Sequence, residues 1–120
     1  MPEHQAFRRQ WRFYETPAGN RPVKDYLASL PESDRLAIAA AMKDVAYEGL
    51  RAAKHLQGHG DLYEVIAEGG GNDYLLLFCP EGQFHQVLLA LHAFSKRSRA
   101  TPVQEIETAT RRRALWRQRA

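Results

Sequence analysis

Cysteine is nearly absent from this chain, and long apolar runs are absent altogether. One cysteine, Cys79, excludes a disulfide framework within the chain and is typical of a reducing compartment. No apolar run approaches the roughly 18 residues that a membrane-spanning helix needs. The polar N-terminus also lacks the apolar core of a signal peptide. We therefore expect a cytoplasmic protein with no membrane partner.

Residue patterns that hold metals or activate nucleophiles are missing too. The histidines are His4, His55, His59, His85 and His92. They show neither the HxH nor the HExxH spacing, and the pair four residues apart, His55 and His59, lies in a glycine-bearing loop. The glycines at 69–71 indicate a hairpin turn rather than a phosphate loop, and Ser95 and Ser98 have no nucleophile-elbow context. We expect no metal and no cofactor.

Length and composition predict one domain over residues 1–120, with a mobile lead-in over residues 1–10. The hydrophobic fraction of 44% and the charged fraction of 26% are ordinary for a globular protein. The net charge of +3 is unevenly spread, because residues 96–120 carry eight cations against two acids and the remainder carries nine against twelve. Such a basic segment indicates a nucleic acid or an acidic protein as partner, or else a solvated helix face with a basic tail.

The remaining patterns predict an α+β domain. Aromatic and polar residues alternate over 11–16, which predicts a first strand. Two helices follow, one opened by Pro22 and stopped by Pro31, the other ending at Gly49. Strands are expected over 62–67, 74–79 and 86–94, and a closing helix over 102–118. We expect a small antiparallel sheet, a meander with an N-terminal strand, with the helical hairpin on one face, the other face open, and a C-terminal helix.

The strand over 86–94 is the centre of this prediction. Both of its alternating sets are apolar, so it should be covered on two sides. One set comprises Val87, Leu89, Leu91 and Ala93, and the other comprises Leu88, Ala90 and Phe94, with His92 interrupting the second set. Thr101 and Pro102 then predict a helix start with the threonine as N-cap.

Cations and a histidine gather where this strand leaves the core. Lys54 and His55 precede one strand, His92 ends another, and Lys96, Arg97 and Arg99 follow it. In a meander these groups can lie at the same end of the sheet, where cations would hold a phosphodiester and a histidine would move a proton. Each residue also has a plain interpretation: His92 as a hydrogen-bonded histidine at the core edge, and the cations and His55 as solvated surface or loop residues.

Several motifs in this order resemble the HigB branch of the RelE/ParE toxin superfamily, including its phage-derived relatives. They are Arg21-Pro22-Val23, Leu62-Tyr63-Glu64, His92-Ala93-Phe94-Ser95-Lys96-Arg97, Thr101-Pro102, Glu105-Ile106-Glu107-Thr108-Ala109 and Arg112-Arg113. The resemblance spans roughly residues 11–118. It implies the toxin of a type II toxin–antitoxin module that enters the ribosome and cleaves mRNA without a metal ion.

The resemblance also implies partners and site residues. Catalytic roles fall to His92, Lys96, Arg97 and Arg99, and RNA or phosphate contacts to Lys54, His55, Arg112 and Arg113. The expected partners are a cognate helix-turn-helix antitoxin similar to HigA and mRNA on the ribosome, with operator DNA bound only through the antitoxin. Without a helix-turn-helix signature of its own, the chain has little support as an independent transcription factor.

Two departures from the resemblance keep an alternative open. Ile66 and Leu75 stand where members of the family usually carry arginines, so two phosphate-binding cations are replaced by apolar side chains. The alternative is a toxin-fold protein with weak or no nuclease activity, which acts by binding an antitoxin, RNA or another target such as gyrase.

Overall fold

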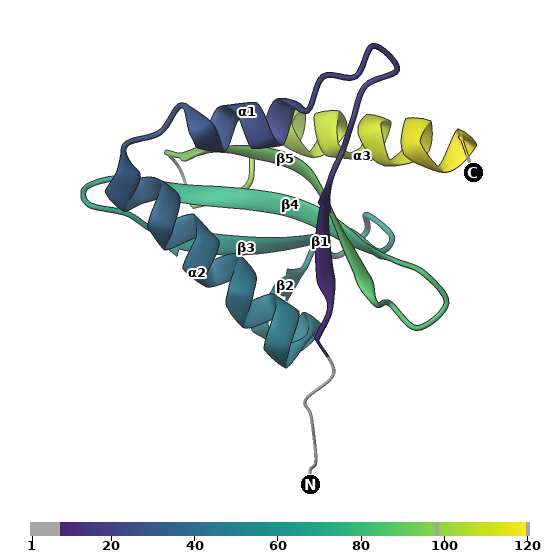
Figure 1. Ribbon diagram of the computed structural model, residues 1–120, viewed down its shortest axis with the longest axis horizontal. Helices are drawn as coiled ribbons and strands as arrows, with labels where there is room; N and C mark the ends of the chain where they lie inside the picture. The colour runs from purple at the N-terminus through teal and green to yellow at the C-terminus, as the bar shows by residue number, and fades with distance from the viewer. Residues whose placement is uncertain (1–7, 98, 120) are drawn as a thin grey trace, which may run out of the picture.

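The computed structural model describes residues 8–97 and 99–119. The elements, in chain order, are β1 (Gln10–Phe13), α1 (Pro22–Ala28), α2 (Glu32–Glu48), the short 3-10 helix η1 (Leu50–Ala52), β2 (Lys54–His55), β3 (Tyr63–Glu68), β4 (Asp73–Glu81), β5 (Val87–Lys96) and α3 (Val103–Gln118) (Figure 1). Residues 1–7 of the expected lead-in lie outside the described residues, whereas Gln10 already belongs to β1. No helix in the described part is long and apolar enough to cross a membrane.

The α+β class is confirmed, but the sheet is mixed rather than antiparallel. Its strand order is β1-β5-β4-β3-β2, and the meander of β3, β4 and β5 is present. The first strand pairs in parallel with β5. Helices α1 and α2 connect β1 to β2 at the far edge of the sheet, and the strands from β2 to β5 then lead back to β1. Sequence patterns missed β2, since a strand of two exposed residues carries no alternation.

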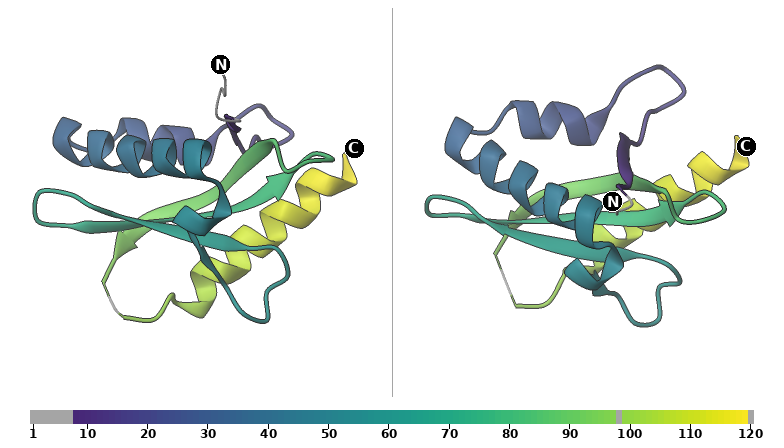
Figure 2. Two further views of the ribbon diagram at one scale, coloured as in Figure 1. Left: turned by 90° about the horizontal axis from the view of Figure 1, so that it is seen from below. Right: turned by 60° about the horizontal axis from the view of Figure 1, so that its bottom comes forward.

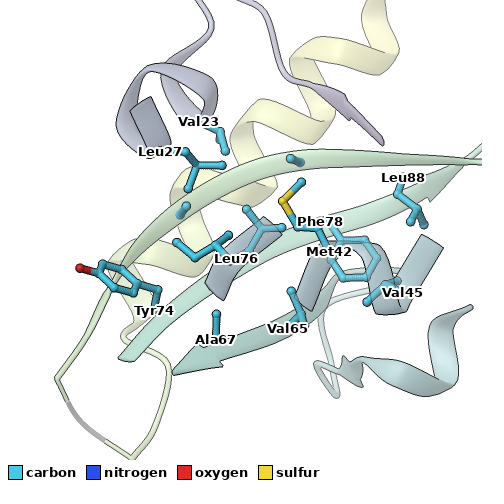
Figure 3. Close-up of a cluster of buried hydrophobic side chains, with 13 residues drawn as sticks. Val23, Leu27, Met42, Val45, Val65, Ala67, Tyr74, Leu76, Phe78 and Leu88 are labelled. Carbon is cyan, nitrogen blue, oxygen red and sulfur yellow. The ribbon is translucent and has the colours of Figure 1, made fainter. Parts of the chain in front are cut away.

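Helices cover both faces of the sheet, so the expectation of an open face was wrong. On one face, α1 and α2 contribute Val23, Leu27 and Met42 to a cluster that includes Leu76 and Phe78 of β4 (Figure 3). On the other face lies α3, and the two helical layers are seen on opposite sides of the strands in Figure 2. This second cover follows from two-sided apolar strands, because leaving either face of β4 or β5 in water would expose leucines.

A register shift between β4 and β5 changes which residues face which helices. Leu77 pairs with His92 and Phe78 with Ala90, so Leu91 has no partner on β4. One extra residue on one strand is a β-bulge, and beyond it the alternation of side chains is displaced by one position. The predicted faces are therefore wrong after Leu91: Ala93 packs on the α1–α2 side, and Phe94 packs on the α3 side.

The start of α3 also differs from the prediction by one residue. Pro102 occupies the N-cap position, and no side chain caps the helix. The Thr101 hydroxyl instead donates a hydrogen bond to Glu64 Oε1 at 2.7 Å. Thr101 thus connects the head of α3 to β3. At the end of α2, by contrast, Gly49 stands at the cap with a positive φ of 88°, as its sequence position predicts.

Asp34 joins the start of α2 to the hairpin between β3 and β4. Its buried carboxylate accepts hydrogen bonds from the Tyr74 hydroxyl at 2.5 Å and from the Gly70 amide at 3.1 Å. The tyrosine bond first, and then the amide bond, hold the pKa of Asp34 below its usual value. Gly69 lies so close that an added Cβ would come 2.5 Å from Asp34 Oδ1.

The two neighbouring glycines should therefore respond differently to alanine. Gly69→Ala pushes against the Asp34 carboxylate and should lower the free energy of unfolding by about 1–3 kcal/mol. Gly70→Ala is the matched control, because its Cβ would meet only Ser33 Oγ at 3.8 Å and the amide donor is retained. Urea unfolding of both variants checks this, and equal stabilities would contradict the role given to Asp34.

Candidate functional site

A row of side chains crosses the sheet on the face that α3 covers. Lys54 of β2 lies opposite Glu64 of β3, Glu64 opposite Leu77 of β4, and Leu77 opposite His92 of β5. Residues directly opposite one another in antiparallel strands share a face. The head of α3 lies over this row, because Thr101 bonds to Glu64 there. The register thus brings the predicted Lys54 and His92 to one face of the sheet.

His92 forms the chemical centre of this row. Its Nε2 lies 2.6 Å from Glu105 Oε1, and its Nδ1 lies 3.4 Å from Arg112 Nη1. The ring stacks on Phe94 with centroids 5.4 Å apart, and the side chain is 18% exposed. Burial holds the pKa of His92 below its usual value; Glu105 acts to raise it, and the charges of Arg112 and Arg111 add to the fall.

These neighbours select one form of the imidazole. A lowered pKa makes His92 neutral at pH 7, so one ring nitrogen carries a proton and the other accepts. The hydrogen-bond network assigns the proton to Nε2, which donates to the Glu105 carboxylate, while Nδ1 accepts from Arg112. The arrangement is a carboxylate–histidine pair at the head of a helix, suited to proton transfer.

Arg112 is held inside the protein rather than extended toward a phosphate. Its Nη1 donates to the carbonyl oxygen of Leu91 at 2.8 Å, and its guanidinium lies 5.6 Å from the ring centroid of Tyr14. Burial lowers its pKa from the usual value. The carbonyl that it satisfies belongs to the extra residue of the β-bulge. Arg112 therefore fastens α3 to the sheet and touches His92 at the same time.

Arg113 is likewise engaged in internal contacts. Its Nη1 donates to Asp61 Oδ1 at 2.7 Å and to the carbonyl oxygen of His59 at 3.1 Å, and its side chain is 14% exposed. Arg117, one turn later, bonds to Asp61 and Glu81. These carboxylates come from the loop before β3 and from the end of β4. They pair with two of the eight cations that the sequence concentrates in its last quarter.

The cations at the end of β5 and in the loop after it lie at the edge of the site. Lys96, opposite Asp73 on β4, donates to the carbonyl oxygen of Arg99 at 2.9 Å. Arg97 is exposed and close enough to Tyr26 of α1 for its charge to act on the pKa of that hydroxyl. Arg99 is exposed. Arg97 and Arg99 thus lie in the loop that connects β5 to α3, which also contains Thr101.

His55 is not brought into the site. It lies opposite Tyr63, whose ring packs with the α1–α2 cluster, and the two ring centroids are 5.0 Å apart. Its Nε2 lies 2.6 Å from the carbonyl oxygen of Gly60. His55 therefore points to the opposite face from Lys54, its neighbour in the chain, as the two-residue period of a strand requires.

The sequence did not predict that Glu64, Thr101 and Glu105 belong to the site. One signal was available, because Glu105 and Arg112 are seven residues apart in the closing helix and so share a helical face. Nothing in the sequence indicated that this face meets His92. Glu64 is buried and bonded to Thr101, although a strand glutamate is ordinarily expected in water.

A metal site and a reactive cysteine are two other kinds of functional centre, and the described residues support neither. In the described part of the chain, no three His, Cys, Asp or Glu side chains gather as a metal site would require. The thiol of Cys79 is fully buried beside Glu81 at 3.4 Å, and burial raises its pKa far above the usual value. A protonated, inaccessible thiol is a poor nucleophile.

Comparison with known protein families matches residues 25–114, three quarters of the chain, to the phage-derived protein Gp49-like family. The chain belongs to this family. Gp49-like proteins are toxins related to RelE and HigB, and the matched stretch runs from α1 through most of α3. Comparison with individually curated proteins found no match.

Within this Gp49-like chain, the two positions that the resemblance implies to be arginine are partners across the sheet. Ile66 of β3 lies opposite Leu75 of β4, which in turn lies opposite Phe94 of β5. Leu75 is fully buried, whereas Ile66 is 45% exposed. Beside the His92 row there is therefore an apolar row, and any phosphate contact must come from other residues.

The geometry predicts how the His92 pKa depends on Glu105. Removing the carboxylate in Glu105→Gln takes away the influence that raises the pKa, so the His92 pKa should fall further below its usual value. Glu107→Gln, which changes an exposed acid two residues away, is the control and should leave the His92 pKa unchanged. NMR titration of the His92 Cε1 proton measures both, and a rise in Glu105→Gln would contradict this pairing.

Proposed function

We propose that this protein is a HigB-like toxin of a type II toxin–antitoxin module, which stops translation by cutting mRNA on the ribosome without a metal ion. The observation that supports this most directly is the His92–Glu105 pair at the head of α3, with the exposed Arg97 and Arg99 in the loop before it and Lys54 on the same face of the sheet, three strands away. Membership of the Gp49-like family supports the toxin part of the proposal.

The proposed reaction is attack of an RNA 2′-hydroxyl on the adjacent phosphorus. A base removes the 2′-hydroxyl proton, the new P–O2′ bond forms and the P–O5′ bond breaks; the leaving 5′ oxygen takes up a proton from solvent, to which the base later returns its own. Nδ1 of His92 is the base, because Nε2 already donates to Glu105 and the contact of Nδ1 with Arg112 is long at 3.4 Å. Glu105 then stabilises the imidazolium that results.

Cations supply the remaining stabilisation. Arg97 and Arg99 would hold the phosphate and the charge that develops on its oxygens, with Lys96 and Lys54 beside them. Arg112 would contribute by its charge beside His92, since its guanidinium is fastened to the Leu91 carbonyl. The proposed partners are mRNA on the ribosome and a helix-turn-helix antitoxin similar to HigA, which would bring the toxin to operator DNA.

A second candidate function is a toxin-fold protein without strong nuclease activity. The observation that favours it is the combination of an apolar Ile66–Leu75 pair with a histidine whose two ring nitrogens both have protein partners. Loss of one transition-state donor can cost about 10²-fold to 10³-fold in rate. Such a protein would act by binding an antitoxin, RNA or another target such as gyrase.

Induced expression of this chain in a bacterial host separates the two candidates. We expect growth arrest, with primer extension on a reporter mRNA showing new 5′ ends inside translated codons. The double variant Arg97→Ala, Arg99→Ala should lower cleavage by at least about a hundredfold, because two phosphate contacts are lost. Arg21→Ala, Arg51→Ala removes the same charge at two exposed positions before α1 and in η1, outside the site, and is the matched control.

Each outcome decides between the candidates. Cleavage that survives in the control and is lost in the double variant supports the nuclease. Arrest without new 5′ ends, or cleavage that both double variants retain, contradicts the proposed site. A folded and expressed wild-type chain that causes neither arrest nor cleavage favours the binding protein.

A further inference from the structure

An open groove of about 790 Å³ lies between β1, α1 and α2, on the face of the sheet away from His92. In Figure 1 these three elements lie toward the viewer, and Figure 2 shows α3 on the opposite side of the sheet. The floor of the groove is largely apolar, formed by Trp11, Phe13, Leu27, Ala28, Ala39, Met42 and Ala46. Ala28 and Ala39 are exposed to solvent, so apolar surface is available there.

The rim of this groove carries charge of one sign. Lys24 comes from α1, Arg35 and Lys43 from α2, and Arg8 from the residues before β1, and no acid lines the groove. Within the described part of the chain, none of these four cations forms an ion pair. Arg8 and Lys43 lie over the ring of Tyr47, at 5.4 Å and 6.0 Å from its centroid. Whatever binds here gains from negative charge.

Two aromatic side chains of the groove, Trp11 and Tyr47, already have partners within the protein. Trp11 packs edge-on against Phe78 with ring centroids 5.0 Å apart, and its indole N–H donates to the carbonyl oxygen of Met42 at 2.7 Å. The ring of Tyr47 is occupied by the two cations. Binding of single-stranded nucleic acid relies on stacking platforms, whereas an aliphatic floor with a cationic rim suits the side of a peptide.

We propose that this groove binds an acidic, amphipathic segment of a partner protein. Its apolar side chains would lie on the floor beside Leu27, Ala28 and Ala39, and its carboxylates would face Lys24, Arg35 and Lys43. The groove runs along α2 from Arg35 to Tyr47, a stretch of about 20 Å, so a helical segment of about 13 residues would span it. The inference rests on the groove alone and does not depend on the proposed nuclease activity.

Selection from a displayed library of random peptides of about 16 residues tests this without measuring RNA cleavage. The bait is the full chain, and Ala39→Trp, which fills the floor, is used for counter-selection. We expect the retained peptides to combine apolar residues with Asp and Glu, and to bind at least about tenfold more weakly to Ala39→Trp. Ala40→Trp, an exposed neighbour on α2 that does not line the groove, is the control and should bind like the wild type.

Charge reversal at the rim gives the second measurement. Fluorescence anisotropy of a retained peptide should show several-fold weaker binding to Lys43→Glu than to Arg111→Glu, an equal change of charge on α3. The proposal is overturned if no peptide is retained, if the retained peptides lack acids, or if both tryptophan variants bind alike. Binding of a single-stranded RNA that Ala39→Trp abolishes, in the absence of peptide binding, would also overturn it.

Discussion

The one extra residue in β5 governs how this molecule is assembled. Because Leu91 has no partner on β4, both Leu91 and His92 come to the α3 side of the sheet. With regular pairing, His92 would face the cluster under α1 and α2, as the simple alternation of the strand indicated. The β-bulge therefore places the imidazole opposite Glu105, and it leaves a carbonyl that Arg112 satisfies.

Three basic residues near the end of the chain, Arg112, Arg113 and Arg117, make internal contacts and do not contribute to a free cationic surface. Arg112 serves the bulge, and Arg113 and Arg117 bind acids from the loop before β3 and the end of β4. Each exposed ion pair contributes little stability by itself. Removing the half-buried Arg112 guanidinium, by contrast, would leave the Leu91 carbonyl without this hydrogen bond, which costs stability. These three arginines, whose charge in the sequence indicated a partner, thus hold α3 over the apolar face of the sheet.

Sequence reasoning located the elements well and their pairing poorly, for physical reasons. Helix α2 has a glycine at its end, and β4 and β5 are apolar on both faces, so local chemistry was enough to predict them. The parallel pairing of β1, the two-residue β2 and the extra residue in β5 depend on contacts between distant segments. Periodicity carries no information about such contacts. A covered second face could have been inferred, since the pattern of β5 required it.

The same limit applies to the site. His92, Lys54, Arg97 and Arg99 could be nominated because cations and imidazole are the chemistry of phosphodiesters, but their partners could not. Glu105 reaches His92 only because α3 crosses the sheet above the bulge.

The partners of His92 limit how it can act. Its Nε2 bond to Glu105 is short and its Nδ1 contact with Arg112 is long, so the second is the easier to exchange. A phosphate is a stronger acceptor for a guanidinium than a neutral imidazole is. In the proposed reaction, an RNA phosphate near Arg112 would therefore compete with Nδ1 of His92 for the guanidinium and leave Nδ1 able to accept a proton. Under the proposed mechanism, Arg112 therefore covers Nδ1 of His92 in the resting protein, and the nitrogen would become available only when a phosphate binds.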